Sequence, residues 1–262
     1  GKTAYVYVVP SISSSKSNEV FAGIPKTFIY VSQSRGNDSN DGLSRSQPVK
    51  TLSKSIELAR SYENIVIIDG TFDETDLTID YNLTIAAENS ATITVVGNAF
   101  TITDGDVRFV NVSFKNSKYG SSTKNRIISQ TGTGFLFLEG CIFQSNDYKA
   151  LIEASGSIEG ENLIVSDNKD GSFIKCDSIK LKSSVFTNNI ATYTLYKSIL
   201  YTTKTVKFEI ENLTFSGNNV HSGCIYVKGS GTVTDCAFIG NKMMTSNGRG
   251  SAIVLEDGSL VV

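Results

Sequence analysis

The sequence predicts an all-β fold, a right-handed single-stranded parallel β-helix (a solenoid) with one N-terminal capping α-helix. One observation is a recurring phrase: an aromatic or β-branched residue, two spacers, then asparagine. Its six copies start 29, 22, 21, 29 and 23 residues apart. A second observation is that short alternating segments, bounded by Gly, Asn or Asp, lie between these copies. A period of about 20 to 30 residues is typical of solenoids, in which each coil packs on its neighbours.

The apolar residue of the phrase is expected to face the interior. Side chains alternate across a strand, so residues at matching positions of successive coils point the same way. Val165 holds this position in one coil. Aromatic residues hold it in the others, and we predict that they form one structural stack: Phe114, Phe143, Phe186, Phe215 and Phe238.

The asparagine of the phrase is expected at a corner between two strands. Asn tolerates the left-handed backbone of a sharp corner better than most residues. Stacked carboxamides can also hydrogen-bond from coil to coil and satisfy buried polar groups. We therefore predict a structural ladder rather than a ligand site, formed by Asn146, Asn168, Asn189, Asn218 and Asn241.

Three parts follow one another along the chain. Residues 1–27 lack the repeat and contain a strand-like stretch and a Ser-rich segment. Residues 28–63 are predicted as the N-terminal cap of the β-helix, including the capping helix. Residues 64–262 are predicted as its coils. The last six residues read as a turn that leads into another strand, so we expect a piece of a longer repeat array.

The predicted capping helix begins at Thr51 or Ser53, either of which can serve as its N-cap, and ends near Ser61. Leu52, Ile56 and Ala59 follow at helical spacing along one face. A single amphipathic helix before a run of strands is suited to covering the apolar end of the first coil.

The net charge argues against nucleic acid and anionic membranes as partners, and the hydropathy of the sequence argues against membrane helices. The 262 residues carry a net charge of −2, so no basic field favours nucleic acid or an anionic membrane. No apolar run approaches the roughly 18 to 20 residues of a membrane helix.

Cys141 and Cys236 share a register four coils apart, about 19 Å at the strand spacing of about 4.8 Å. That separation excludes a disulfide between them, and cysteine is expected to act as a small buried hydrophobe.

Polysaccharide-degrading β-helices use paired Asp residues with a histidine, or a Lys or Arg base beside acids that hold Ca²⁺. The single histidine, His221, has no such Asp pair. Asp73, Glu74 and Asp76 resemble a solvated turn. The loop 38–42 lacks EF-hand spacing, so capping hydrogen bonds are expected there. We therefore expect no catalysis, no cofactor and no metal site.

An enzyme remains the alternative because acids on different strands can converge in space. The acids in question are Glu153, Glu159, Glu161 and Asp167. Three or more acids in one groove with Lys or Arg would favour an enzyme, whereas a flank poor in acids would favour a binding protein.

Tyrosines between the repeated phrases provide the remaining hint of a binding surface. The two longest repeats carry insertions around residues 118–124 and 192–203, and insertions in solenoids often form a binding face. We predict that Tyr193, Tyr196 and Tyr201 lie at a ligand-binding surface, because exposed aromatic rings stack on sugars and contact proteins. Packing of partly buried loops is the alternative, and Tyr119, Tyr148 and Tyr226 lie in similar stretches.

Several segments resemble known surface proteins. Ile29–Ser32, the loop 36–42, the stretch 48–52 and the strand leading to Gly70 resemble the opening of right-handed β-helix surface proteins. The repeats resemble the F-x-x-N and G-G-A-I motifs of polymorphic outer-membrane-protein repeats. The second motif is degenerate here, and it occurs as Ser222-Gly223-Cys224-Ile225 and Gly250-Ser251-Ala252-Ile253.

Together these features are most similar to the adhesin-like proteins of methanogenic archaea. The resemblance implies an extracellular protein of the cell surface or cell wall that attaches to glycans or proteins on other cells or surfaces. It also implies anchoring through regions absent from this chain. A carbohydrate-active β-helix enzyme (a polysaccharide lyase or hydrolase) and a structural spacer or stalk of a larger surface protein are the alternatives.

Overall fold

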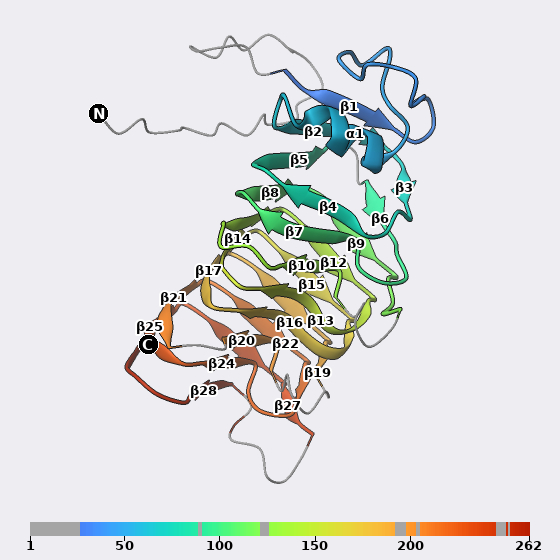
Figure 1. The fold of residues 1–262 in the computed structure, drawn as a ribbon. Helices are drawn as coiled ribbons and strands as arrows, with labels where there is room; N and C mark the ends of the chain where they lie inside the picture. The colour runs from blue at the N-terminus through green and yellow to red at the C-terminus, as the bar shows by residue number, and fades with distance from the viewer. Residues whose placement is uncertain are drawn as a thin grey trace, which may run out of the picture.

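The computed structural model describes residues 27–88, 91–120, 126–191, 198–202, 205–244, 250 and 252–262. The predicted N-terminal segment therefore lies outside the described residues, apart from residue 27. The described residues form 29 strands and one helix. Strands of successive coils pair in parallel and stack into a right-handed parallel β-helix (Figure 1). The predicted fold class is confirmed.

Three long sheets, here called A, B and C, form the walls of the β-helix. Sheet A contains β1 (Ile29–Ser32), β2 (Asn64–Asp69), β5 (Leu83–Ala87), β8 (Val107–Val110), β11 (Leu136–Glu139), β14 (Ser157–Glu161), β17 (Ser178–Lys182), β21 (Val206–Glu211), β25 (Gly229–Thr234) and β29 (Leu260–Val261). Sheet B contains β3 (Thr71–Phe72), β6 (Thr92–Ile93), β9 (Ser113–Lys115), β12 (Ile142–Gln144), β15 (Ile164–Ser166), β18 (Val185–Thr187), β22 (Thr214–Ser216) and β26 (Ala237–Ile239).

Sheet C and a small fourth sheet, D, complete each coil. Sheet C contains β4 (Leu77–Asp80), β7 (Phe100–Asp104), β10 (Ile128–Gln130), β13 (Asp147–Ala154), β16 (Lys169–Cys176), β20 (Leu200–Thr202), β24 (Ile225–Val227) and β28 (Ile253–Leu255). Sheet D contains β19 (Ile190–Ala191), β23 (Asn219–Val220) and β27 (Lys242–Met243).

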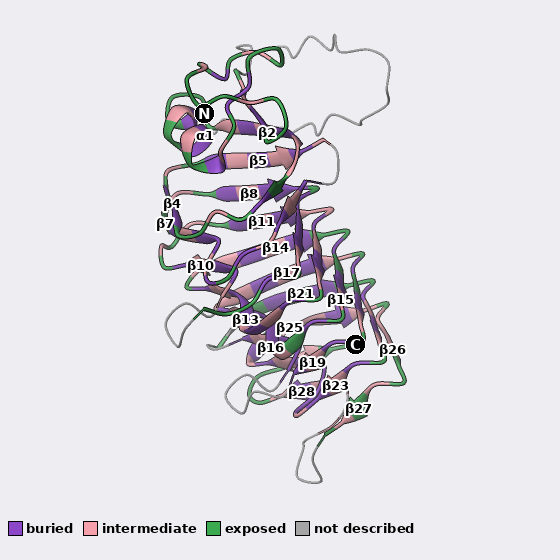
Figure 2. Cartoon of the chain, turned by 90° about the vertical axis from the view of Figure 1, so that its right-hand side faces the viewer, coloured by how far each residue is buried: buried purple, intermediate pink, exposed green. Residues whose placement is uncertain are grey.

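Alternation along the strands separates a dry interior from the outer faces (Figure 2). In β11, for example, Leu136 and Leu138 are buried, while Phe137 and Glu139 face outward and are partly exposed. Parallel pairing in register repeats this arrangement, so the inward residues of successive coils form continuous apolar columns. The outer faces, and sheet A above all, are where charged side chains gather.

Helix α1 (Leu52–Ala59) covers the first coil and packs against β1, β2 and β4. Leu52, Ile56 and Ala59 are all buried, as their spacing predicts. The N-cap is Thr51, whose hydroxyl accepts a hydrogen bond from the Lys54 amide at 3.1 Å. This helix is the one helix among the described residues, and it is too short and too polar to cross a membrane.

Glu74 was predicted to lie in a solvated turn, and that prediction is wrong. Its carboxylate accepts hydrogen bonds from the amides of Leu52 at 2.6 Å and Ser53 at 2.8 Å. Amides in the first turn of a helix have no partner within the helix, and a carboxylate there also favours the helix dipole. Glu74 therefore fixes α1 to the start of the β-helix from 22 residues away.

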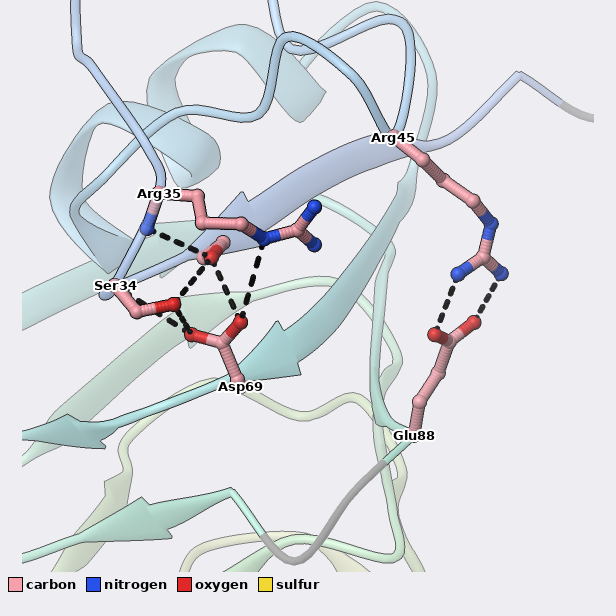
Figure 3. Close-up of polar contacts among 6 residues, drawn as sticks. Ser34, Arg35, Arg45, Asp69 and Glu88 are labelled. Carbon is pink, nitrogen blue, oxygen red and sulfur yellow. Dashed lines mark hydrogen bonds and ion pairs between the residues drawn. The ribbon is translucent and has the colours of Figure 1, made fainter.

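Further polar contacts join the N-terminal cap to the first coils (Figure 3). The Asp69 carboxylate accepts from the hydroxyls of Ser32 at 2.8 Å and Ser34 at 3.0 Å. Arg45 forms an ion pair with Glu88 through both guanidinium NH groups. Burial alone would raise the pKa of Asp69, but the hydrogen bonds from Ser32 and Ser34 outweigh it and lower that pKa.

Candidate functional site

The five ladder asparagines lie one above the other at the end of sheet B. Each Nδ2 donates to the Oδ1 of the next asparagine at 2.9 to 3.0 Å, from Asn146 to Asn241. The same Nδ2 also donates to a backbone carbonyl of the preceding coil, such as Phe143 for Asn168, at 2.9 Å. Ser117 holds the ladder position of the preceding coil, and its amide donates to Asn146 Oδ1 at 2.9 Å. The contacts are internal, so the ladder has a structural role.

The prediction that these asparagines adopt the left-handed backbone of the corner is wrong, because none of the five has a positive φ. The left-handed residue is the one before the ladder position, as in Ser145 (φ 56°), Asn188 (φ 55°) and Gly217 (φ 63°). The corner is therefore made by one residue, and the next directs its carboxamide into the stack. Sequence reasoning assigned both tasks to the asparagine.

Five aromatic residues form the interior column, in direct register through sheet B. The rings of Phe114 and Phe143 stack with centroids 4.7 Å apart, and those of Phe186 and Phe215 at 4.9 Å. Val165 interrupts the column between Phe143 and Phe186. Phe173 of sheet C fills the gap edge-on, with its centroid 5.0 Å from Phe143 and 5.4 Å from Phe186.

Of the three tyrosines predicted at a binding surface, Tyr193 and Tyr196 lie outside the described residues. Tyr201 lies on the outer face of β20, directly opposite Tyr226 of β24. Their ring centroids are 5.2 Å apart and their planes are tilted by 32°. Tyr148 behaves differently, since it is fully buried and its hydroxyl donates to the Gly97 carbonyl at 2.6 Å.

Charged residues continue the line of Tyr226 and Tyr201 along the rod axis. Tyr201 lies opposite Lys175, and Lys175 lies opposite Glu153. Glu153 forms ion pairs with both Lys175 and Arg126. We call these five residues the tyrosine strip: Tyr226, Tyr201, Lys175, Glu153 and Arg126. Sequence reasoning identified Tyr201 but missed the strip, because its members are 22 to 27 residues apart. Four of them meet through strand register, and Arg126 reaches Glu153 through its side chain.

The second candidate is a hollow on the outer face of sheet A, which we call the sheet-A groove. It has a volume of about 310 Å³, at the lower end of the roughly 300–1,000 Å³ typical of ligand sites. A smaller hollow of about 210 Å³ adjoins it and shares Glu159 and Lys180. Three acids and three bases line the groove beside Phe137: Glu139, Glu159, Glu161, Arg108, Lys180 and Lys182.

Most of these charges are already paired. Arg108 pairs with Glu139. Lys180 and Lys182 both reach toward β21, with Nζ atoms 2.9 Å from Glu209 and 3.1 Å from Glu211. The hydrogen bond that Lys180 donates to Glu209 raises the pKa of Lys180, so this lysine is held as an ammonium.

Other titratable groups do not form a reactive centre in the described part of the chain. No three His, Cys, Asp or Glu side chains there are placed to hold a metal ion. The Asp38 carboxylate accepts from the amides of Lys50 at 2.8 Å and Thr51 at 3.0 Å, in line with the predicted capping contacts. Cys141, Cys176 and Cys224 are buried, as predicted for small hydrophobes. Burial raises the pKa of Cys141 to about 12, which suppresses its thiolate.

No protein-family model matches the chain, and no curated protein matches it in sequence. Among solved structures, the chain is similar to pectate lyase Pel9A, with a TM-score of 0.45 and 12% sequence identity. The similarity covers 88% of this chain and 78% of that one. It concerns the course of the backbone, and no residue role is transferred from it.

Proposed function

We propose that this chain is a non-catalytic segment of an extracellular, cell-surface adhesin-like protein. It attaches through the tyrosine strip to a glycan or protein on another cell or surface. The observation that carries the proposal is the pairing of Tyr201 and Tyr226 on an outer sheet face, next to Lys175. An adjacent pair of tyrosines on an outer sheet face is the type of surface that contacts sugar rings and proteins, and the neighbouring Lys175–Glu153 ion pair supplies donors and acceptors for hydroxyls.

The repeat motifs support the same proposal. Their resemblance to adhesin-like proteins of methanogenic archaea favours a cell-surface location. A stiff stack of coils also suits a protein that holds a binding face away from a cell wall.

Binding to glycan arrays and whole cells tests the proposal. Replacing Tyr201 and Tyr226 together by alanine should weaken binding by about five- to 150-fold, since each ring contributes about 0.5–1.5 kcal/mol. Tyr119→Ala is the matched control, because Tyr119 is exposed and lies outside the strip. Binding that survives the double substitution, in a variant of unchanged thermal stability, would remove the strip from the proposal. A spacer role would then be favoured.

A carbohydrate-active enzyme is the second candidate, because the sheet-A groove brings three acids together with Arg and Lys. The raised pKa of Lys180 opposes a role as proton-abstracting base. Incubation with uronic-acid polysaccharides, with and without Ca²⁺, tests this candidate. Formation of unsaturated or reducing sugars that Glu161→Gln abolishes would establish an enzyme in place of a binding protein.

A further inference from the structure

Two carboxylates in the sheet-A groove differ from the other acids around them. Glu159 and Glu161 project from β14 on the same side, two residues apart, between Phe137 and Glu139 of β11 and the two lysines of β17. Neither forms an ion pair with any residue that the structure describes, whereas Glu139, Glu209 and Glu211 each do. The groove therefore presents two carboxylates that form no ion pair among the described residues.

The nearest lysines are directed toward other acids. Lys180 and Lys182 lie directly opposite Glu159 and Glu161 in the parallel pairing. Their ammonium groups instead contact the acids of β21, on the far side. A positive group entering the groove could thus contact both β14 carboxylates without breaking an existing pair.

Aromatic surface adjoins these carboxylates. Phe137 lies opposite Glu159 in the β11–β14 pairing. Its ring stacks with that of Phe135 at a centroid distance of 5.7 Å, and Phe135 is 42% exposed. Large aromatic side chains at an exposed position favour contact with the flat face of a sugar ring, and their π faces also attract cations.

We propose that the sheet-A groove binds a cationic glycan, an oligomer of unacetylated amino sugar. The ammonium groups are held by Glu159 and Glu161, and the sugar rings lie against Phe135 and Phe137. The two adjoining hollows, which share Glu159, supply room for consecutive sugar units. This site is separate from the tyrosine strip and does not depend on it.

Calorimetric titration of the whole chain with a glucosamine hexamer, and with its fully N-acetylated counterpart, tests the proposal. The titration is run at about pH 5.5, above the ordinary Glu pKa of about 4.3. The acetylated oligomer keeps the sugar rings but lacks the charge. We expect the acetylated oligomer to bind at least about tenfold more weakly than the charged one. We expect the same loss when the charged oligomer is titrated into a variant that carries both Glu159→Gln and Glu161→Gln.

Matched variants separate this site from its surroundings. Glu211→Gln removes a paired carboxylate from the same sheet face and should change affinity less than about threefold. Tyr201→Ala with Tyr226→Ala should leave binding of the hexamer unchanged, so failure here and failure of the proposed adhesion are distinguishable. Equal affinity for the two oligomers, no binding of the charged one, or an unaffected Glu159/Glu161 variant would overturn the proposal. Tighter binding of an oligolysine peptide at the same residues would overturn the choice of a glycan.

Discussion

The two ends of the stack differ in how they cover the apolar interior (Figure 1). At one end α1 lies over the first coil, and Leu52, Ile56 and Ala59 are buried beneath it. At the other end Phe238 and Cys236 are only partly buried, although their equivalents in the middle of the stack are inaccessible. The comparison teaches that a repeated residue contributes according to its neighbours rather than its type, as expected of a quasi-one-dimensional fold.

The largest expected effect comes from the aromatic column. Phe186→Ala should reduce the free energy of unfolding by about 4 kcal/mol, because it opens a cavity between Phe173 and Phe215. Phe238→Ala, at the other end of the column, should cost only about 1–2 kcal/mol because this ring is only partly buried. Urea unfolding followed by circular dichroism measures both. Equal losses would contradict the dependence on neighbours.

Removal of a ladder asparagine should come next in size. Asn168→Ala leaves the Phe143 carbonyl and the Asn146 amide buried without their partners, which should cost about 3 kcal/mol. Asn241→Ala disturbs partly buried groups at the end of the ladder and should cost about 1 kcal/mol. Hydrogen exchange should show faster exchange at the Asn146 amide in the first variant. Unchanged exchange there would mean that water replaces the carboxamide.

Loss of the external helix cap should have a smaller effect. Glu74→Ala leaves two amides of the first turn of α1 without their acceptor and should destabilise the N-terminal end by about 1 kcal/mol. Glu211→Ala removes an exposed ion pair with Lys182 and should cost at most about 0.5 kcal/mol. Hydrogen exchange across α1 distinguishes the two. An effect of Glu211→Ala as large as that of Glu74→Ala would contradict the assigned cap.

The smallest expected effect is a pH dependence confined to the N-terminal cap. Burial would raise the pKa of Asp38, but the hydrogen bonds that this carboxylate accepts from Lys50 and Thr51 outweigh burial and lower its pKa. The pKa of Asp69 is lowered in the same way by hydrogen bonds from Ser32 and Ser34. The folded pKa lies below the unfolded value, so the unfolded chain binds protons first. The stabilisation is complete above the ordinary Asp pKa of about 3.9 and is lost as the pH falls through the folded value.

Thermal unfolding between about pH 5 and pH 2.5 measures this dependence. An Asp38→Asn variant should show a shallower decline than the unchanged chain. If thermal stability fell equally with pH in both proteins, other acidic groups would account for the loss of stability at low pH.

Residues that repeat were predicted well, and residues that act once were not. The columns of Phe143 and Asn168 follow from a period and an alternation, both of which can be read along the chain. The role of Phe173 could not be read in this way, because it compensates for Val165 from a different sheet. Glu74 and Tyr148 likewise act through contacts 22 and 51 residues away.

The sequence by itself determined the coil length, the inward face of each strand and the place of the capping helix, because period and polarity act locally. Only the tertiary structure decided which outer residues became neighbours. Parallel pairing brings together side chains more than twenty residues apart. Tyr201 thus lies opposite Tyr226, and Glu159 lies opposite Lys180. Which ammonium reaches which carboxylate then depends on side-chain geometry across the sheet, and Glu159 and Glu161 form no ion pair among the described residues.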